Sequence, residues 1–591
     1  MSNRLSRTIA LAAKRLALAL LAATALIAGP SGSQVTDAPA TAPPKSLLPE
    51  GFAAPAAPVV EAAPLPVAPQ AADAPDASRG GMVPGATPLP APSAPPPDRV
   101  VQTIRDPGGF GDAAFAGSDG RFVAGLLRRL TAPGASRWSH IILRRALLTA
   151  GPPVGAAASE WVAERARVLF AIGEVDAAKA LLDPLPPDQM TPQLIRIIGQ
   201  VTLAAGDIPG LCPVADAGDA VSPDPLWRLA TAMCAAIGGD DVGAASAFDR
   251  LHHDRVVDGF DLQLGERIAA ISLARGRAAN LDWSSVRTMT PYRFGVAVAA
   301  DVAIPLPLLT ELAAKTGGTS WGWMLRAPGQ IPAARAAALE AAAVLGIASA
   351  DDFVGGIAAA SAGLDRSALA AAPAGRLRDA YAAPTTAARV AALRSIVADA
   401  GDGGRYAALI ETGLAAARLP VDRAFATDAG DLIAAMLAVG VEDRAARWWP
   451  VVATGDDVPS RAAWALLAVG ANGGIPVSPT QFAAWAKDVS PHRAALFLAA
   501  LDGLGSARGA AWDRICADAG LVPMANSWTR AIDAAGAAKR PGEVAVLAAT
   551  GLQTNWRSVP PAHLRHIVAA WVAAGHGHEA RMLAAEAVTR G

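Results

Sequence analysis

Cysteine is scarce in this sequence: three occur among 591 residues, and no two of them are spaced as Cys-x-x-Cys. This scarcity argues against a zinc site built from clustered cysteines and against a thioredoxin-like redox centre. Charge is also low, because Lys, Arg, Asp and Glu make up 17% of the residues and the formal net charge is −1. Nucleic-acid binding requires a broad basic surface, so we expect no nucleic-acid partner.

Several catalytic signatures are missing as well. The sequence contains no His-Glu-x-x-His zinc motif and no Gly-rich phosphate loop of the GxxxxGK[ST] type. It also lacks the Glu-Ser pair that marks the catalytic acid of lytic transglycosylases, a family with helical superstructures. We therefore predict no catalytic residue, cofactor, metal or small-molecule ligand, and an unrecognised enzymatic activity is the alternative.

The N-terminus has the pattern of a secretory signal. Basic residues at positions 4, 7, 14 and 15 precede a 13-residue apolar run, Leu16–Ala28, and small residues follow it. The run is short for a membrane span, so residues 1–29 are predicted to be a signal peptide, with an uncleaved inner-membrane anchor through residues 16–28 as the alternative. No cysteine follows that could carry a lipid. We expect a periplasmic or other extracytoplasmic location.

Residues 30–98 differ in composition from the rest of the chain. They hold 18 of the 47 prolines and few large apolar side chains. Proline is excluded from helix interiors, and such a segment cannot bury enough apolar surface to offset the entropy of ordering. The segment is predicted to be a disordered Pro/Ala-rich linker, acting either as a membrane tether or as a simple spacer.

Residues 99–591 form a predicted α-helical body, because apolar residues recur at helical spacing between Gly, Pro and Asp. Four segments share one pattern: an apolar helix ends at a glycine, and an alanine stands five residues later at the start of a second helix. The Gly and Ala pairs are Gly173 and Ala178, Gly239 and Ala244, Gly440 and Ala445, and Gly575 and Ala580. Glycine ends a helix in the left-handed conformation, and a small residue lets two helices pack closely.

This pattern resembles the tetratricopeptide (TPR) family of helix-turn-helix repeats, which also places a small residue five positions after a turn glycine. In the last copy Ala587 matches the second small position of the family, and in the first copy Pro184 and Pro186 approximate its terminal proline. The other first-helix positions are not clearly matched, and no register is found over residues 280–420. The resemblance implies a right-handed α-solenoid with a concave protein-binding face and no catalysis.

Two cysteines are candidates for a disulfide, and two tryptophans are candidates for a partner contact. Cys212 and Cys234 flank a Pro-rich loop and the next helix, and in an oxidising compartment they are expected either to form a disulfide or to remain separate buried thiols. Cys516 shares a helical face with Trp512 and is expected in the core. Adjacent Trp448 and Trp449 cannot both face one core, so they are candidate partner-contact aromatics.

Three other patterns are interpreted as structural. His563 and His566 lie about 20 Å along a helix from His576 and His578, too far apart for one metal ion. The Gly575–Ala580 match to G-x-G-x-x-A follows a helix instead of a strand, so it is not a dinucleotide loop. Gly318–Gly322 fits G-x-S-x-G, but the pattern predicts a Gly-rich turn around Ser320 instead of a nucleophile elbow.

Together these features predict an exported cell-envelope protein that acts as a non-catalytic scaffold and binds one or more envelope proteins. A cell-wall-directed enzyme or glycan-binding protein that uses exposed tryptophan is the first alternative. A membrane-tethered structural spacer is the second.

Overall fold

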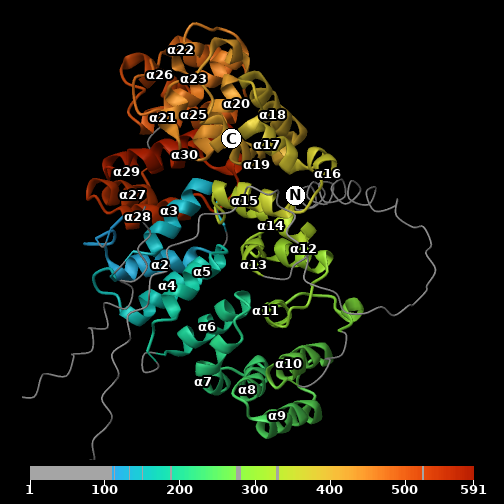
Figure 1. Cartoon of the computed structure of the whole chain (residues 1–591). Helices are drawn as coiled ribbons and strands as arrows, with labels where there is room; N and C mark the ends of the chain where they lie inside the picture. The colour runs from blue at the N-terminus through green and yellow to red at the C-terminus, as the bar shows by residue number, and fades with distance from the viewer. Residues whose placement is uncertain are drawn as a thin grey trace, which may run out of the picture. The chain divides into compact units, whose positions relative to one another are not determined.

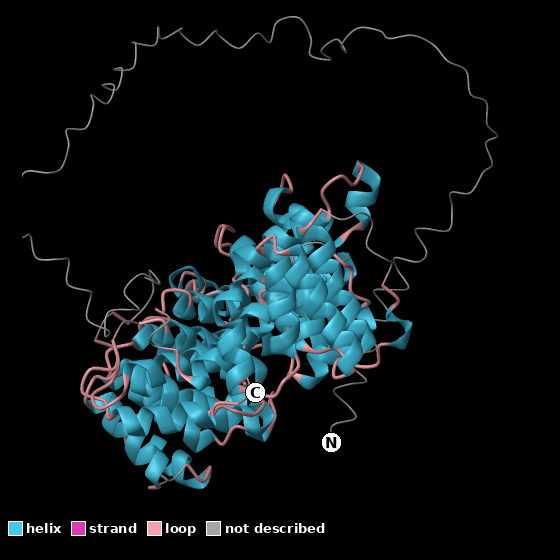
Figure 2. Cartoon of the chain, turned by 90° about the horizontal axis from the view of Figure 1, so that it is seen from below, coloured by secondary structure: helices cyan, strands magenta, loops and turns pink. Residues whose placement is uncertain are grey.

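The architecture comes from a computed structural model, which describes residues 110–591 except 112, 132, 150, 187–189, 275–280, 328–331 and 522–524. Every regular element in this part of the chain is a helix, and the only strand-like pairing is an isolated bridge between Asp119 and Val154 (Figures 1 and 2). The predicted all-α class is confirmed. The predicted signal segment, residues 1–29, and the predicted linker, residues 30–98, lie outside the described residues.

The first helices of the body are α2 (Gly120–Arg129), α3 (Arg137–Leu147), α4 (Ala158–Ala171), α5 (Val175–Leu182), α6 (Pro192–Ala204), α7 (Ala215–Val221), α8 (Leu226–Ile237), α9 (Asp241–Asp254), α10 (Gly259–Ser272), α11 (Pro291–Ala299), α12 (Leu306–Lys315) and α13 (Trp321–Arg326). The next are α14 (Pro332–Leu345), α15 (Ala350–Ala360), α16 (Arg366–Ala371), α17 (Pro373–Ala382), α18 (Thr386–Asp399), α19 (Gly401–Ala416), α20 (Ala429–Ala438), α21 (Glu442–Ala446) and α22 (Trp449–Val452).

The last α-helices are α23 (Val458–Gly470), α24 (Pro479–Ala486), α25 (Pro491–Gly503), α26 (Ala510–Asp518), α27 (Ser527–Ala537), α28 (Pro541–Gly551), α29 (Pro561–Ala573) and α30 (Gly577–Arg590). Short 3₁₀ helices are η3 (Pro209–Val214), η4 (Trp283–Ser285), η5 (Arg423–Asp428) and η6 (Trp556–Ser558).

The starts of the helices follow from side-chain caps in the sequence. Many helices are preceded by Ser, Thr, Asp or Asn, whose side-chain oxygen accepts a hydrogen bond from a first-turn N–H; examples are Asp119, Ser136, Thr191, Asp240, Thr290 and Asn526. Proline often occupies the first turn, where its missing N–H leaves no partner unsatisfied. Helix α29 begins in this way at Pro561, and no side chain caps it.

The four glycines of the repeat pattern end helices as predicted. Gly173, Gly239, Gly440 and Gly575 have φ between 79° and 91°, the left-handed region that favours glycine. After each glycine the next backbone N–H reaches back five residues, as from His576 to the carbonyl of Trp571, which satisfies a carbonyl at the helix end. The four alanines that follow, at positions 178, 244, 445 and 580, are all buried. The helices of each pair pack on one another: α4 with α5, α8 with α9, α20 with α21, and α29 with α30.

Two further copies of this turn lack glycine and so escape the sequence pattern, whereas the turn at Gly206 keeps the glycine but has leucine instead of alanine five residues later. Lys539 and Asp301 have φ values of 54° and 51° and occupy the same place after α27 and α11. The N–H of the residue after each one also bonds to the carbonyl five residues back. The stretch Gly295–Ile304 has a β-like sequence. In the structure α11 occupies its first half, and the turn at Asp301 follows.

We expect Ala580→Leu to destabilise the protein by about 2 kcal/mol, because the side chain is fully buried where α30 packs on its neighbours and added methylenes strain a packed core. Urea unfolding followed by helical circular dichroism measures the change. Ala573→Leu places the same side chain at an exposed position at the end of α29 and serves as the control. Equal stability of the two variants would show that the alanine does not set the helix spacing.

The two ends of the described body pack against each other. Helices α2 and α3 contact α28, and α3 also contacts α30, as Figure 1 shows for the cyan and red helices. Helix α30 in turn contacts α20, α23, α25 and α29 and buries most of its length. In a linear solenoid each repeat contacts only its sequence neighbours, so these contacts depart from the simplest form of the predicted architecture.

A buried carboxylate joins these ends. Glu586, near the end of α30, is 3% exposed and accepts hydrogen bonds from the Ser136 hydroxyl at 2.5 Å and from the backbone N–H groups of Arg137 at 2.8 Å and Trp138 at 3.1 Å. It also pairs with Arg590 at 2.7 Å. The carboxylate thus satisfies free N–H groups at the start of α3 and places negative charge at the positive end of that helix.

Arg137 extends this cluster to a third part of the chain. Its side chain is buried and donates to the backbone carbonyls of Ala343, at the end of α14, and Ala348. One first-turn residue of α3 therefore holds both α14 and α30. No sequence pattern indicated this cluster, because its members lie about 200 and 450 residues apart in the chain.

Candidate functional site

The two adjacent tryptophans separate at a break between two short helices. Helix α21 ends at Ala446, and Trp448 is the N-cap of α22. Trp448 is 1% exposed and belongs to the core, whereas Trp449 is only partly buried. Trp449 is therefore the one of the pair that presents surface to solvent.

Trp449 lines an open hollow of about 510 Å³. Its walls come from three connections: the segment before η5, the α21–α22 turn, and the loop after α23. The lining residues are Val421, Ala446, Arg447, Trp449, Pro450, Gly473, Gly474 and Ile475. Apolar and aromatic side chains thus make up most of the wall, and Arg447 is the one charged residue among the lining residues. Ligand-binding pockets typically combine a mainly apolar wall with a few polar groups in this way.

The loop glycines keep one side of the hollow open. Gly473 and Gly474 have φ values of 82° and 79°, and a Cβ on either would meet no atom within 4 Å. The left-handed backbone explains why glycine stands at both positions, and the missing side chains leave backbone accessible to a ligand.

Two donors in the hollow are unused. The Arg447 side chain is exposed and forms no ion pair with a described residue, and the indole N–H of Trp449 donates to none of them. An aromatic ring beside free donors can stack on an apolar or cyclic group and donate to its oxygens.

A second hollow, of about 640 Å³, lies along the outer face of α9. Its lining comes from one helix alone and contains no aromatic residue: Asp241, Val242, Ala245, Ser246, Asp249, Arg250 and His253. Val242 is 80% exposed there. A single polar helix face offers little enclosure, so the Trp449 hollow is the stronger candidate.

Cys212 and Cys234 are joined by a disulfide in the structure. Cys212 lies in η3 and Cys234 in α8, so the bond fixes the η3–α7 segment onto the helix that follows it. Cys516 is the remaining cysteine; it is free, partly buried, and burial raises the pKa of its thiol.

Peptide mapping of the protein, isolated without reductant, is expected to recover Cys212 and Cys234 in one disulfide-linked peptide pair and Cys516 as a free thiol, which serves as the internal control. Closing a loop of this length stabilises a protein by about 3 kcal/mol on the chain-entropy model. Free thiols at both positions 212 and 234 would contradict the pairing.

The serine motif is a turn. Gly317 and Gly318 have positive φ, and Ser320 lies between α12 and α13, where its buried hydroxyl accepts a hydrogen bond from Thr316. No strand precedes it in the described part of the chain.

The four C-terminal histidines point to four different neighbours. His563 lies against the Trp528 ring, His566 pairs with Asp533, His576 meets the edge of the Phe110 ring, and His578 pairs with Glu442. Among the described residues no group of three or more His, Cys, Asp or Glu side chains is arranged to hold a metal ion. The G-x-G-x-x-A match forms the α29–α30 turn.

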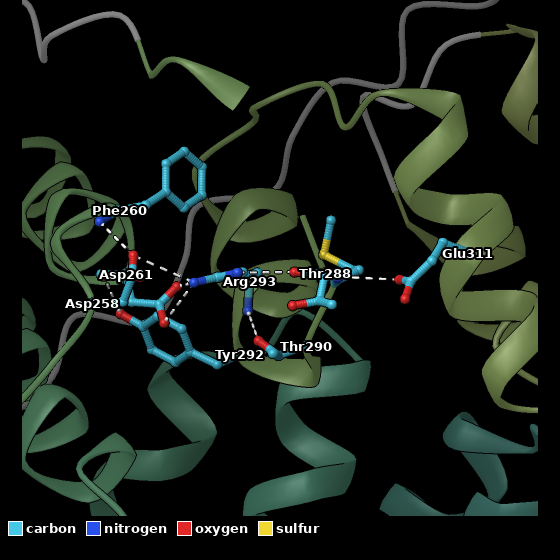
Figure 3. A network of polar contacts seen from close by, with 9 residues as sticks. Asp258, Phe260, Asp261, Thr288, Thr290, Tyr292, Arg293 and Glu311 are labelled. Carbon is cyan, nitrogen blue, oxygen red and sulfur yellow. Dashed lines mark hydrogen bonds and ion pairs between the residues drawn. The ribbon is translucent and has the colours of Figure 1, made fainter. Parts of the chain in front are cut away.

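Figure 3 shows a network of polar contacts around Arg293. Arg293, at the start of α11, donates to the Asp261 carboxylate at 2.5 Å and to the Thr288 carbonyl at 2.9 Å, and its guanidinium lies 5.8 Å from the centre of the Phe260 ring. The Tyr292 hydroxyl donates to the Asp261 carbonyl at 3.0 Å. These bonds hold the start of α10 to the start of α11, and the donors that they use are not available to a ligand.

Two carboxylates are electrostatically strained. Burial raises the pKa of Glu411 on α19 to about 7, a shift that Arg376 reduces and the carboxylate of Glu340 on α14 increases. Partial desolvation also raises the pKa of Glu340, although its side chain remains exposed to solvent. A raised carboxyl pKa is common at catalytic sites but also arises from packing alone. No metal-ligand cluster accompanies this pair among the described residues, and we attribute the raised pKa values to packing.

None of the described helices combines the length and the apolar character needed to cross a bilayer. Comparison of the whole chain with known protein families, with curated proteins and with solved structures found no match.

Proposed function

We propose that the chain is an exported cell-envelope protein that acts as a non-catalytic scaffold, binding another protein through a TPR-like, right-handed stack of helix pairs. The observation that carries the proposal is the Trp449 hollow, an open, largely apolar depression with two unused donors. Tryptophan and arginine are the side chains that most often dominate binding energy at protein interfaces.

Two further observations support export. The sequence of residues 1–29 has the order of a signal peptide, and the Cys212–Cys234 bond is of a kind that persists in oxidising compartments such as the periplasm. The repeated Gly and Ala turn supports the TPR-like arrangement, because it produces stacked helix pairs.

Trp449→Ala is expected to weaken binding of the protein partner by about 2 kcal/mol, or roughly thirty-fold, since removal of a central aromatic contact has this effect at interfaces. The measurement is photo-crosslinking in the envelope, with p-benzoylphenylalanine replacing Ile475 in the hollow. The expected result is an adduct with another protein whose yield falls in the Trp449→Ala background.

The control places the same photo-reactive residue at Val242 on α9, outside the hollow. The same adducts at both positions, or no change with Trp449→Ala, would overturn the scaffold proposal at this site. Pelleting with purified cell wall that is lost with Trp449→Ala would instead assign the hollow to a glycan, since a tryptophan face can stack on a sugar.

A further inference from the structure

Helices α15 and α16 form a flap, residues 350–371, that is weakly attached to the rest of the body. Among the 11 residues of α15 only Ala350 and Phe353 are buried, and α16 buries none. Helix α15 packs on α14, α17 and α19, whereas α16 packs on α17. Leu364, between the two helices, is 43% exposed. Segments with few buried apolar contacts open at a lower free-energy cost than the core, so this flap is a candidate for local opening.

Carboxylates from the flap and from α19 approach one tyrosine hydroxyl. Tyr381 lies on α17, and burial raises the pKa of its hydroxyl. Arg418 reduces this shift, while the charges of Asp351 on α15 and Glu411 on α19 increase it. Both carboxylates therefore lie close to the same hydroxyl, and like charges on packed helices repel each other. An ionised Glu411 thus opposes the contact between α15 and α19.

Little positive charge offsets an ionised Glu411. Glu340 on α14 adds a second negative charge that disfavours the ionised form, and Arg376 on α17 is the one cation among the described residues that favours it. Arg376 also pairs with Asp399 of α18 at 3.2 Å, so its charge is shared between two carboxylates. Ionisation of Glu411 therefore adds a charge that its neighbours do not neutralise.

Two other arginines near α19 are engaged by other groups. Arg405, on α19 itself, pairs with Asp431 of α20. The guanidinium of Arg418, which follows α19, lies 4.9 Å from the centre of the Tyr381 ring. Neither arginine forms an ion pair with Glu411, so the helices packed around α19 leave this carboxylate without a cation of its own.

Proton binding and closure of the flap are linked through this carboxylate. Burial raises the pKa of Glu411 from its ordinary value of 4.5 to about 7. Release of α15 from α19 returns the carboxylate to water, where its pKa falls back toward 4.5. The closed form then binds more protons than the open form between these two values. Its stability is therefore complete below about pH 4.5 and is lost as the pH rises through about 7.

We propose that the α15–α16 flap is a pH-dependent cover over α19, which is closed while Glu411 is protonated and opens more often once Glu411 is ionised. Opening makes Phe353 and the surface of α14, α17 and α19 beneath α15 accessible to solvent. The exposure of this surface then follows the pH. The inference uses no residue of the Trp449 hollow and does not depend on the proposed function.

Hydrogen–deuterium exchange of the purified full-length chain at pH 6 and pH 8, with labelling times scaled for intrinsic exchange, tests the proposal. Protection of the α15 amides is expected to fall about ten-fold from pH 6 to pH 8. This is the change in the opening constant for a carboxyl group whose pKa is about 7 when closed and 4.5 when open. In Glu411→Gln, which cannot ionise, protection is expected to be the same at both pH values. Asp402→Asn removes an exposed acid from α19 and is expected to keep the fall.

Amides of α20 and α30, two largely buried helices, report opening of the whole body in the same experiment. They are expected to be at least about a hundred-fold more protected than those of α15 at both pH values. Similar protection in all three helices would overturn the proposal, because α15 would then exchange only when the body unfolds. Equal protection of α15 at pH 6 and pH 8 in the wild type would overturn it as well. A fall that persists in Glu411→Gln would reject Glu411 as the group that controls the flap.

Discussion

Replacing Glu586 with alanine is expected to lower the free energy of unfolding by about 3–5 kcal/mol, the range seen when one partner of a buried ion pair is removed. The substitution leaves the Arg590 and Arg137 side chains without their buried carboxylate neighbour and removes the acceptor for two backbone N–H groups at the start of α3. A buried donor without an acceptor adds its own desolvation cost.

Urea unfolding, followed in parallel by circular dichroism and tryptophan fluorescence, measures this loss. Asp443→Ala, at an exposed acid in the first turn of α21, is the control and is expected to change stability by less than about 0.5 kcal/mol. Glu586→Gln retains oxygen and shape and is expected to lose less than the alanine variant. A change below 1 kcal/mol for Glu586→Ala would show that the cluster does not hold α3 to α30.

The Glu411→Gln variant is expected to be more stable than the wild type above pH 7, by about 3 kcal/mol, and equally stable below about pH 4.5. Burial raises the pKa of Glu411 from its ordinary value of 4.5 to about 7. Between these two values the folded protein binds more protons than the unfolded chain, so wild-type stability falls as the pH rises through this window. Glutamine removes the titration, and each pKa unit corresponds to about 1.4 kcal/mol.

Urea midpoints measured from pH 4 to pH 8 test this dependence. Asp402→Asn changes an exposed acid on the same helix and is expected to leave the pH profile unchanged. Glu340→Gln is expected to reproduce part of the gain, because the Glu340 charge adds to the pKa shift of Glu411. A Glu411→Gln profile parallel to that of the wild type would contradict the buried-acid explanation.

Local signals in the sequence predicted the parts of the fold that local chemistry determines. Gly440 and Gly575 announce helix ends because their left-handed backbone favours glycine, and the alanine five residues later indicates close helix packing. The same logic fails where Lys539 or Asp301 adopts that conformation, because a pattern built on glycine does not include these residues. The Asp301 turn lies within residues 280–420, where no repeat register was found.

Contacts between residues that lie far apart in the sequence could not be predicted. Ser136 and Glu586 lie 450 residues apart, and only the folded chain brings them together. Periodicity also could not decide which of Trp448 and Trp449 is buried, because the helix breaks between Ala446 and Trp449 and the two rings are not on one continuous helix. The Trp449 hollow depends on loops from three parts of the chain, which no sequence window contains.

The contact of α3 with α28 and α30 sets an order of events during synthesis. Helices α2 and α3 leave the ribosome about 400 residues before α28, so the parts of their surfaces that α28 covers stay exposed while the remainder is made. Contacts this distant in sequence form late, because the closure entropy of a long loop must be overcome first. In a nascent chain of this kind, the surfaces of α3 that α28 and α30 cover stay accessible to chaperones until the 14 residues of α30 have emerged.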